Sequence, residues 1–402
     1  MSQTYSFRSL FAVHGYSQLY LARLVSCTAV WIDFTLIFSF LTFYWHASAT
    51  EVGLASILYG LPGLLLGPLF GRLADQYSPF SLLYISYSIR AITSVALTLS
   101  DSIDIFLVII FFKGIANLGV MPAEQVAMRA IISKEFFPAS ASLMTITDQT
   151  AKILSPLAAA AAVQQAMGAN IFWISTSICL IGIALLTWLR INVGRIITNF
   201  AQNRKTFNMG NLISFMALKN SLMISFIASV ISGFILGFYD PFLALFLKNL
   251  DFPPSVFGTI ISCTAAGSVL GALFFKKIFS IERSLSIISL ALICFGATVI
   301  APPLIIASGT PLSFFILGAL WVVNGGCFSL IAMTFSVSLQ MECPAELIGT
   351  VSTTARSFQL GAMISAPLLS SVVSNATSIS TTFVISGTLA IVTGLIILKL
   401  RP

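Results

Sequence analysis

The sequence predicts an all-α membrane protein of twelve transmembrane helices, arranged as two pseudo-symmetric six-helix bundles. Three observations support this fold class. The 402 residues are 57% hydrophobic and 8% charged, with a mean hydropathy of +1.00, whereas soluble domains average about 25% charged residues. The apolar residues are grouped in stretches long enough to cross a bilayer. The second half of the chain also repeats local patterns of the first half.

Each predicted helix is an apolar stretch of about 20 residues or more, which spans a bilayer at about 1.5 Å rise per residue. Helices satisfy their own backbone in hydrocarbon, and these stretches lack the alternation of a β-barrel. The twelve stretches are about 19–44, 52–71, 80–100, 104–127, 140–163, 170–190, 219–247, 255–275, 284–306, 312–338, 346–373 and 379–399.

The longest hydrophilic stretch lies near the middle of the chain and divides the spans into six and six. It carries five basic residues and no acidic residue. We therefore predict an N-terminal bundle over residues 1–189, a cytoplasmic basic linker over residues 190–219 and a C-terminal bundle over residues 220–402.

Corresponding helices of the two predicted bundles end with the same glycine pattern. Gly267-x-x-x-Gly271 closes the eighth span as Gly67-x-x-x-Gly71 closes the second, 200 residues earlier. A six-helix unit that occurs twice in parallel is typical of transporters whose substrate binds near the midplane between the two units.

The basic residues are distributed unevenly along the chain. Fourteen of the twenty Lys and Arg residues fall in alternate loops or at the two chain ends, and the opposite loops hold only Lys248. By the positive-inside rule, both termini face the cytoplasm. Attraction to anionic membrane lipids accounts for the net charge of +7 without a nucleic-acid partner.

The sequence excludes the common classes of enzyme. Its two histidines, His14 and His46, lie outside the spans, and no Ser–His pairing, HExxH motif or Cys/His metal spacing is present. No Walker glycine loop is present either. We predict a protein that is not an enzyme and that uses a proton gradient as its energy source without a bound cofactor.

The turn after the second span carries the most specific motif. Gly71, Leu73 and Asp75 follow an apolar stretch, with Arg72 inside the turn. This pattern resembles the Gly-x-Leu-x-Asp loop of the major facilitator superfamily, which lies between the second and third helices. The family has several basic residues after the aspartate, whereas this chain has Gln76, Pro79 and Phe80 at those positions.

Other segments resemble one branch of that superfamily, the bacterial macrolide-efflux and enterobactin-export proteins. They are the Phe-Arg-x-Leu-Phe of residues 7–11, the Ala-Thr-Glu-Val-Gly-Leu of residues 49–54, and Pro122-Ala123. Exporters of the superfamily usually carry Gly-Pro in the fifth span, where this chain has Ser155-Pro156.

The resemblance implies which helices line the substrate cavity and which form the gate. Spans 1, 4, 7 and 10 would line the cavity, so Asp33 and Lys113 would face it. At the cytoplasmic side, Asp75 would bond the positively charged start of the eleventh span and hold the outward-open state. Gly71, Arg72 and Pro156 are the further gating candidates.

Ionisable residues inside the membrane are expensive and mark functional candidates. A carboxyl in apolar surroundings can load and release protons near neutral pH. For proton coupling we single out Asp33 and Asp148. For substrate binding, the candidates are Lys113, Lys152, Arg356 and Asp240.

Each candidate also has a structural interpretation. Asp148 and Lys152 are four residues apart and can form an ion pair within one helix. Asp33 can form a permanent salt bridge with Lys113. Arg90 is expected to be structural, and two further residues, Arg23 and Glu124, are expected to make gate or loop contacts rather than bind ligands.

The functional prediction is a monomeric secondary transporter of the bacterial inner membrane that works by alternating access. The favoured activity is proton-coupled export of a drug-like compound or a siderophore-type metabolite that could be anionic. A proton-coupled importer is the alternative, and a receptor or scaffold without transport is a remote one.

Overall fold

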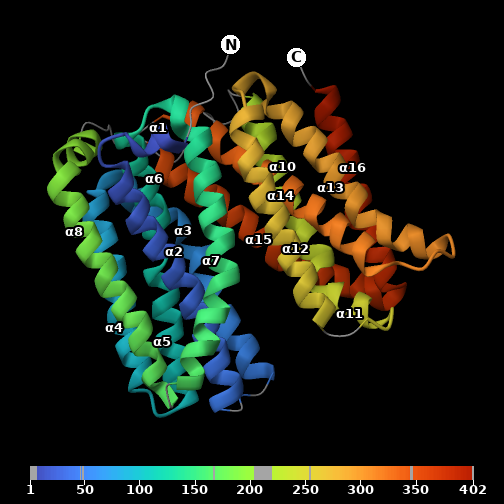
Figure 1. Ribbon diagram of the computed structural model, residues 1–402, viewed down its shortest axis with the longest axis horizontal. Coiled ribbons are helices and arrows are strands. Elements are labelled where there is room, and N and C mark those ends of the chain that lie inside the picture. The colour runs from blue at the N-terminus through green and yellow to red at the C-terminus, as the bar shows by residue number, and fades with distance from the viewer. Residues whose placement is uncertain are drawn as a thin grey trace.

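The computed structural model describes residues 7–45, 47, 49–165, 168–202, 220–252, 255–344 and 347–400. All regular secondary structure in these residues is helical. Two groups of helices converge at the end of the molecule where both chain termini lie and diverge toward the opposite end (Figure 1). We call these the terminal end and the opposite end.

The first group contains α1 to α8. Its elements are α1 Phe7–Phe11, α2 Tyr16–Ser39, the π-helical turn η1 Phe40–Tyr44, α3 Ala49–Gln76, α4 Pro79–Thr98, α5 Ile103–Ala116, α6 Val120–Ile131, η2 Lys134–Phe136, α7 Phe137–Gln165, η3 Gly168–Ile171 and α8 Phe172–Gln202. We call this group the N-terminal half.

The second group, the C-terminal half, contains α10 to α16. Its elements are α10 Asn220–Tyr239, η4 Asp240–Phe242, α11 Leu243–Lys248, α12 Ser255–Ile278, η5 Ile281–Arg283, α13 Ser284–Ala307, α14 Phe314–Glu342, α15 Ile348–Ala376 and α16 Ile379–Lys399.

The helices confirm the predicted fold class. Eleven helical segments of the described chain are long and apolar enough to cross a membrane. The fifth predicted span corresponds to α7, whose 29 residues are also long enough. The predicted linker begins as helix, because α8 continues to Gln202. Residues 203–219 lie outside the described part of the chain.

Besides the first span, whose end is the π-helical η1, the fourth and seventh predicted spans are not single α-helices. In the fourth span, α5 ends at Ala116 and α6 begins at Val120. Gly119 lies at this break because a Cβ there would meet Ser86 Oγ at 2.5 Å. In the seventh span, α10 gives way to η4 beside Pro241, whose ring removes a backbone donor.

Apolar packing within each half is independent of the other half near the opposite end. One buried cluster draws only on the N-terminal half and includes Leu36, Phe106 and Phe172. The large cluster around Phe295 and Trp321 draws only on the C-terminal half. Each half therefore has a core of its own.

Two other clusters join the halves at the terminal end. One combines residues such as Leu10 and Phe137 with Phe275 and Met333. The second brings Val126 of α6 into a cluster of C-terminal-half residues. The halves are thus packed together at the terminal end, while the cores near the opposite end stay separate.

Candidate functional site

A carboxylate at the terminal end connects the two halves. Asp75 lies near the end of α3, and its Oδ1 accepts a hydrogen bond from the backbone N–H of Gly349 at 2.8 Å. Its Oδ2 accepts from the backbone N–H and the hydroxyl of Thr350, at 2.6 and 2.7 Å. Since α15 begins at Ile348, the carboxylate lies at its positive end. The contact expected for Asp75 is present.

Glycine lets α3 and α15 approach closely beside this contact. A Cβ on Gly71 would overlap both the Thr353 hydroxyl and the Gly349 carbonyl oxygen. One turn earlier, a Cβ on Gly67 would meet Ser357 Oγ at 2.5 Å. The bonds of Asp75 therefore depend on the absence of a side chain at Gly71.

The other two gating candidates are Arg72 and Pro156. Arg72 is exposed, and among the described residues it makes no ion pair. Pro156 belongs to α7, but its side chain lies outside the described part of the chain.

A second inter-half contact at the terminal end was not predicted. Arg129, in the last turn of α6, donates from Nε to Gln340 Oε1 at 2.9 Å and from Nη2 to the Cys343 carbonyl at 2.8 Å. It also donates to the Gln340 carbonyl. Since α14 ends at Glu342, the guanidinium lies at its negative end. Two oppositely charged residues of the N-terminal half thus bind the segment between α14 and α15: Arg129 bonds the end of α14, and Asp75 bonds the start of α15.

Replacing Arg129 with glutamine should loosen the terminal end. Hydrogen bonds to a charged group contribute about 1.5–3 kcal/mol, so the open fraction should rise about tenfold or more. Cys343 is a native reporter, because the residue is only 4% exposed next to this contact. Maleimide labelling of Cys343, followed by mass spectrometry, should accelerate by that factor.

Arg195→Gln removes the same charge from an exposed site on α8 and should leave the labelling rate unchanged. An unchanged rate in Arg129→Gln would show that Arg129 does not hold the terminal end closed.

A cavity of about 300 Å³ lies between the halves. It is bounded by α2, α6 and α7 on one side and by α14 and α15 on the other. The lining residues used below are Arg23, Met121, Glu124, Gln125, Met128, Met144, Asp148, Met333, Phe335, Gln340 and Arg356.

Arg23 binds two carboxylates in this cavity. Its Nη1 donates to Glu124 Oε2 at 2.7 Å, and its Nη2 donates to Asp148 Oδ1 and Oδ2 at 3.0 and 3.2 Å. The Cys27 thiol also donates to Asp148 Oδ1, at 2.9 Å. The cluster joins α2, α6 and α7. Arg23 and Glu124, expected to make gate or loop contacts, bind each other across helices and line the cavity.

The ion pair within α7 is not formed. Asp148 pairs with Arg23 of α2, and the Lys152 ammonium lies 5.6 Å from the centroid of the Trp31 ring, also on α2. A guanidinium that can bridge two carboxylates competes well against a single ammonium on a flexible stem. Lys152 is therefore left with its charge exposed.

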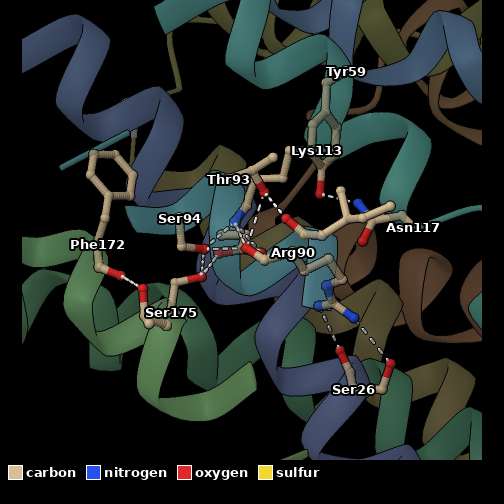
Figure 2. A network of polar contacts seen from close by, with 12 residues as sticks. Ser26, Tyr59, Arg90, Thr93, Ser94, Lys113, Asn117, Phe172 and Ser175 are labelled. Atoms are coloured by element: carbon tan, nitrogen blue, oxygen red, sulfur yellow. Dashed lines mark hydrogen bonds and ion pairs between the residues drawn. The ribbon is translucent and has the colours of Figure 1, made fainter. Parts of the chain in front are cut away.

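Asp33 and Lys113 form an ion pair inside the N-terminal half. Lys113 Nζ lies 3.2 Å from Asp33 Oδ2, and both side chains are fully buried. Ser175 donates to Asp33 Oδ1, and Lys113 donates to Ser94 Oγ at 2.5 Å. Figure 2 shows Lys113 pointing toward Ser94 and Arg90, with Ser175 on the far side of Ser94.

The expectation that Asp33 and Lys113 face the cavity is therefore wrong for this conformation. Their partners come from α4 and α8, so the polar faces of α2 and α5 turn into the N-terminal half. Burial without partners would be costly, and the serine hydroxyls satisfy groups that the ion pair leaves free.

Arg90 extends the same network. Its Nη1 and Nη2 donate to the hydroxyl and carbonyl of Ser26, each at 3.4 Å (Figure 2). Its guanidinium also lies 5.4 Å from the centroid of the Tyr87 ring. These contacts tie α4 to α2, which agrees with the structural role expected for Arg90.

The C-terminal half has a neutral network between the corresponding helices. Tyr239 donates to Asn324 Oδ1 at 3.3 Å, and Asn324 Nδ2 donates to Thr298 Oγ1 at 3.1 Å. All three are buried. They come from spans 7, 10 and 9, the repeats of spans 1, 4 and 3. Uncharged groups therefore meet the packing needs of this fold at a site where the N-terminal half holds charges.

The remaining substrate-binding candidates are reachable from solvent. Arg356 is exposed and lines the cavity, and its charge interacts with that of Asp148. Asp240 and Lys152 are exposed on opposite halves and interact electrostatically with each other. Three of the four candidates are thus accessible, and Lys113 is not.

Comparisons with known proteins match this architecture over nearly the whole chain. The family model for the Major Facilitator Superfamily matches residues 19–359. The uncharacterized MFS-type transporter YfiS of Bacillus subtilis (strain 168) is 21% identical over 397 residues, which cover 96% of this chain and 92% of YfiS.

Two solved structures share the fold at low sequence identity. The human organic anion transporter MFSD10 (TETRAN) superimposes with a TM-score of 0.75 at 13% identity, covering 95% of this chain and 98% of that chain. A bacterial homologue of the iron transporter ferroportin, in an outward-facing state, gives a TM-score of 0.74 at 13% identity, with the same coverage.

Proposed function

The chain belongs to the major facilitator superfamily of transporters, and on this premise we propose that it is a proton-coupled secondary transporter that exports a small molecule by alternating access. The observation that carries the proposal is the contact between Asp75 and the start of α15. It joins the two halves through hydrogen bonds that can break without exposing the core of either half.

We infer which side of the membrane the conformation faces from where the two halves meet. They are held at the terminal end by Asp75 and Arg129, and their cores are separate near the opposite end. The basic loops favour a cytoplasmic position for the terminal end. In that orientation the present conformation is closed toward the cytoplasm and faces outward.

Both halves and the cavity come from one chain, so a monomer is sufficient for transport. Rocking of one half against the other would expose the cavity first to one side and then to the other. Membrane lipids and the substrate are the partners that this mechanism needs.

We assign the coupling of this motion to protons to two carboxylates. The Asp148 side chain is 40% exposed and pairs with Arg23, so protonation from the cavity would break this ion pair and leave Arg23 bound to Glu124 alone. Asp33 is fully buried in its ion pair with Lys113, so it can exchange a proton only when the N-terminal half rearranges. Charging and discharging such groups changes which conformation is favoured.

Export is supported by the resemblance of residues 7–11, 49–54 and 122–123 to macrolide-efflux and enterobactin-export proteins. We extend the proposal to a drug-like or siderophore-type substrate on the same ground. A proton-coupled importer is the second candidate, because the same carboxylates can serve symport.

Transport in inside-out membrane vesicles tests the proposal. A panel of siderophores, macrolides and lipophilic cations is offered with an acidic vesicle interior. We expect accumulation of at least one class, and loss of its pH dependence in Asp33→Asn and Asp148→Asn. Accumulation only in right-side-out vesicles with an acidic exterior would favour the importer. Uptake whose rate changes neither with the pH gradient nor with the substitutions would contradict proton coupling.

A further inference from the structure

The cavity between the halves has two kinds of lining that the proposed function does not explain. One kind is soft and apolar. Met121 and Met128 lie two turns apart on α6, and α7 and α14 add Met144 and Met333. Thioether side chains are flexible and polarisable, and they adapt to apolar ligands of different shape. Phe335 extends the same surface.

The second kind of lining is polar and is incompletely satisfied. Arg356 is exposed to the cavity, and among the described residues it forms no ion pair. Gln125 Oε1 is buried at the cavity wall, and no donor in the described part of the chain bonds to it. A ligand that offers an acidic group and an N–H or O–H would satisfy both residues.

The carboxylates of the cavity are already engaged. Arg23 binds Glu124 at 2.7 Å and both oxygens of Asp148, and Cys27 adds a further donor to Asp148. A cationic ligand would have to share these oxygens with Arg23, whereas an anion can bind Arg356 without such competition. The planar guanidinium suits a carboxylate in bidentate geometry.

We propose that the cavity binds an amphipathic organic anion, which deepens the proposed function and rests on it. The acidic group pairs with Arg356, the apolar body lies against the four methionines, and an N–H or O–H of the ligand donates to Gln125. A volume of about 300 Å³ is at the lower end of small-molecule pockets and suits a compound of one or two rings.

Calorimetric binding to the purified full-length protein in lipid nanodiscs tests this proposal. Indole-3-acetate, indole-3-acetamide and tryptamine share one ring system and are anionic, neutral and cationic. Indole-3-acetate should bind about tenfold or more tighter than the other two, the effect of about one charged hydrogen bond. 1-Naphthaleneacetate, which lacks the N–H, should bind several-fold more weakly, and Gln125→Leu should remove that difference.

Three variants identify the group responsible. Arg356→Gln should abolish the preference for the anion, and Arg356→Lys should retain part of it. Arg195→Gln removes an exposed arginine on α8 and should leave the preference intact. A matching thermal unfolding midpoint for each variant shows that the comparison concerns folded protein.

Four outcomes would overturn the proposal: equal binding of the three indoles, tighter binding of tryptamine, no binding of any probe, or an anion preference that survives Arg356→Gln. Because binding is measured without a gradient, the two proposals can fail separately. Anion binding without gradient-driven transport contradicts the proposed function alone. Gradient-driven export of a cation, with no role for Arg356, contradicts this inference alone.

Discussion

Gly71→Ala should reduce transport by about 5- to 150-fold, because the new methyl group prevents closure at the terminal end. Its Cβ would overlap the Thr353 hydroxyl and the Gly349 carbonyl oxygen, and a backbone atom of α15 cannot move aside alone. Overpacking of this kind costs about 1–3 kcal/mol, which shifts a two-state equilibrium by the factor given above. Separation of α3 from α15 would also break the bonds of Asp75.

The chain offers a matched control on the same helix. A Cβ on Gly60 meets no atom within 4 Å, so Gly60→Ala should transport as the native protein does. Initial rates of gradient-driven uptake in vesicles, normalised to the amount of folded protein, provide the comparison. Equal rates in the two variants would show that close contact between α3 and α15 is not needed for the transport cycle.

Asp33→Asn should destabilise the protein by about 3–5 kcal/mol, because it leaves the buried ammonium of Lys113 without its partner. Lys113→Gln should have a similar effect through the unpaired carboxylate of Asp33. The double variant Asp33→Asn/Lys113→Gln should recover most of the loss. It creates a neutral network of the kind that Asn324 forms in the other half.

The double variant separates a structural role from a coupling role. Thermal unfolding in nanodiscs measures stability, and uptake with and without a pH gradient measures coupling. We expect near-native stability together with loss of gradient-dependent accumulation. If the double variant accumulated substrate as strongly as the native protein, the Asp33–Lys113 pair would be a packing element only.

Much of the fold could be predicted because its causes are local in sequence. A run of about 20 apolar residues must be buried in lipid or protein, and its backbone must be helical there. The bonding of Asp75 to the start of α15 was also predictable, since Gly71 and Asp75 resemble a loop that places a carboxylate at a helix end.

The orientation of each helix about its own axis could not be predicted, and it accounts for the main errors in where the site residues were expected. Counting residues from a span end gives the depth of Asp33 and Lys113, but neighbouring helices decide which way they turn. Ser94 and Ser175 provide hydrogen-bond partners that no pattern within α2 or α5 reveals. The pair therefore lies within one half and not on the cavity wall.

The Arg23 cluster was missed for a related reason. The four-residue spacing of Asp148 and Lys152 favours a pair within α7, and this local pattern concealed partners on other helices. A usable signal did exist. Arg23 and Glu124 are ionisable residues in two spans expected to line the cavity, and a guanidinium can satisfy more than one carboxylate.

Alternating access is the central claim, and paired distance measurements by double electron–electron resonance test it most directly. Spin labels at Tyr77 and Leu400 report on the terminal end, and labels at Leu99 and Phe315 report on the opposite end; all four sites are more than half exposed. Relative to Gly60→Ala, Gly71→Ala should lengthen the terminal distance and shorten the opposite one. Distances that stay fixed at both ends, or that change in the same direction, would contradict the account.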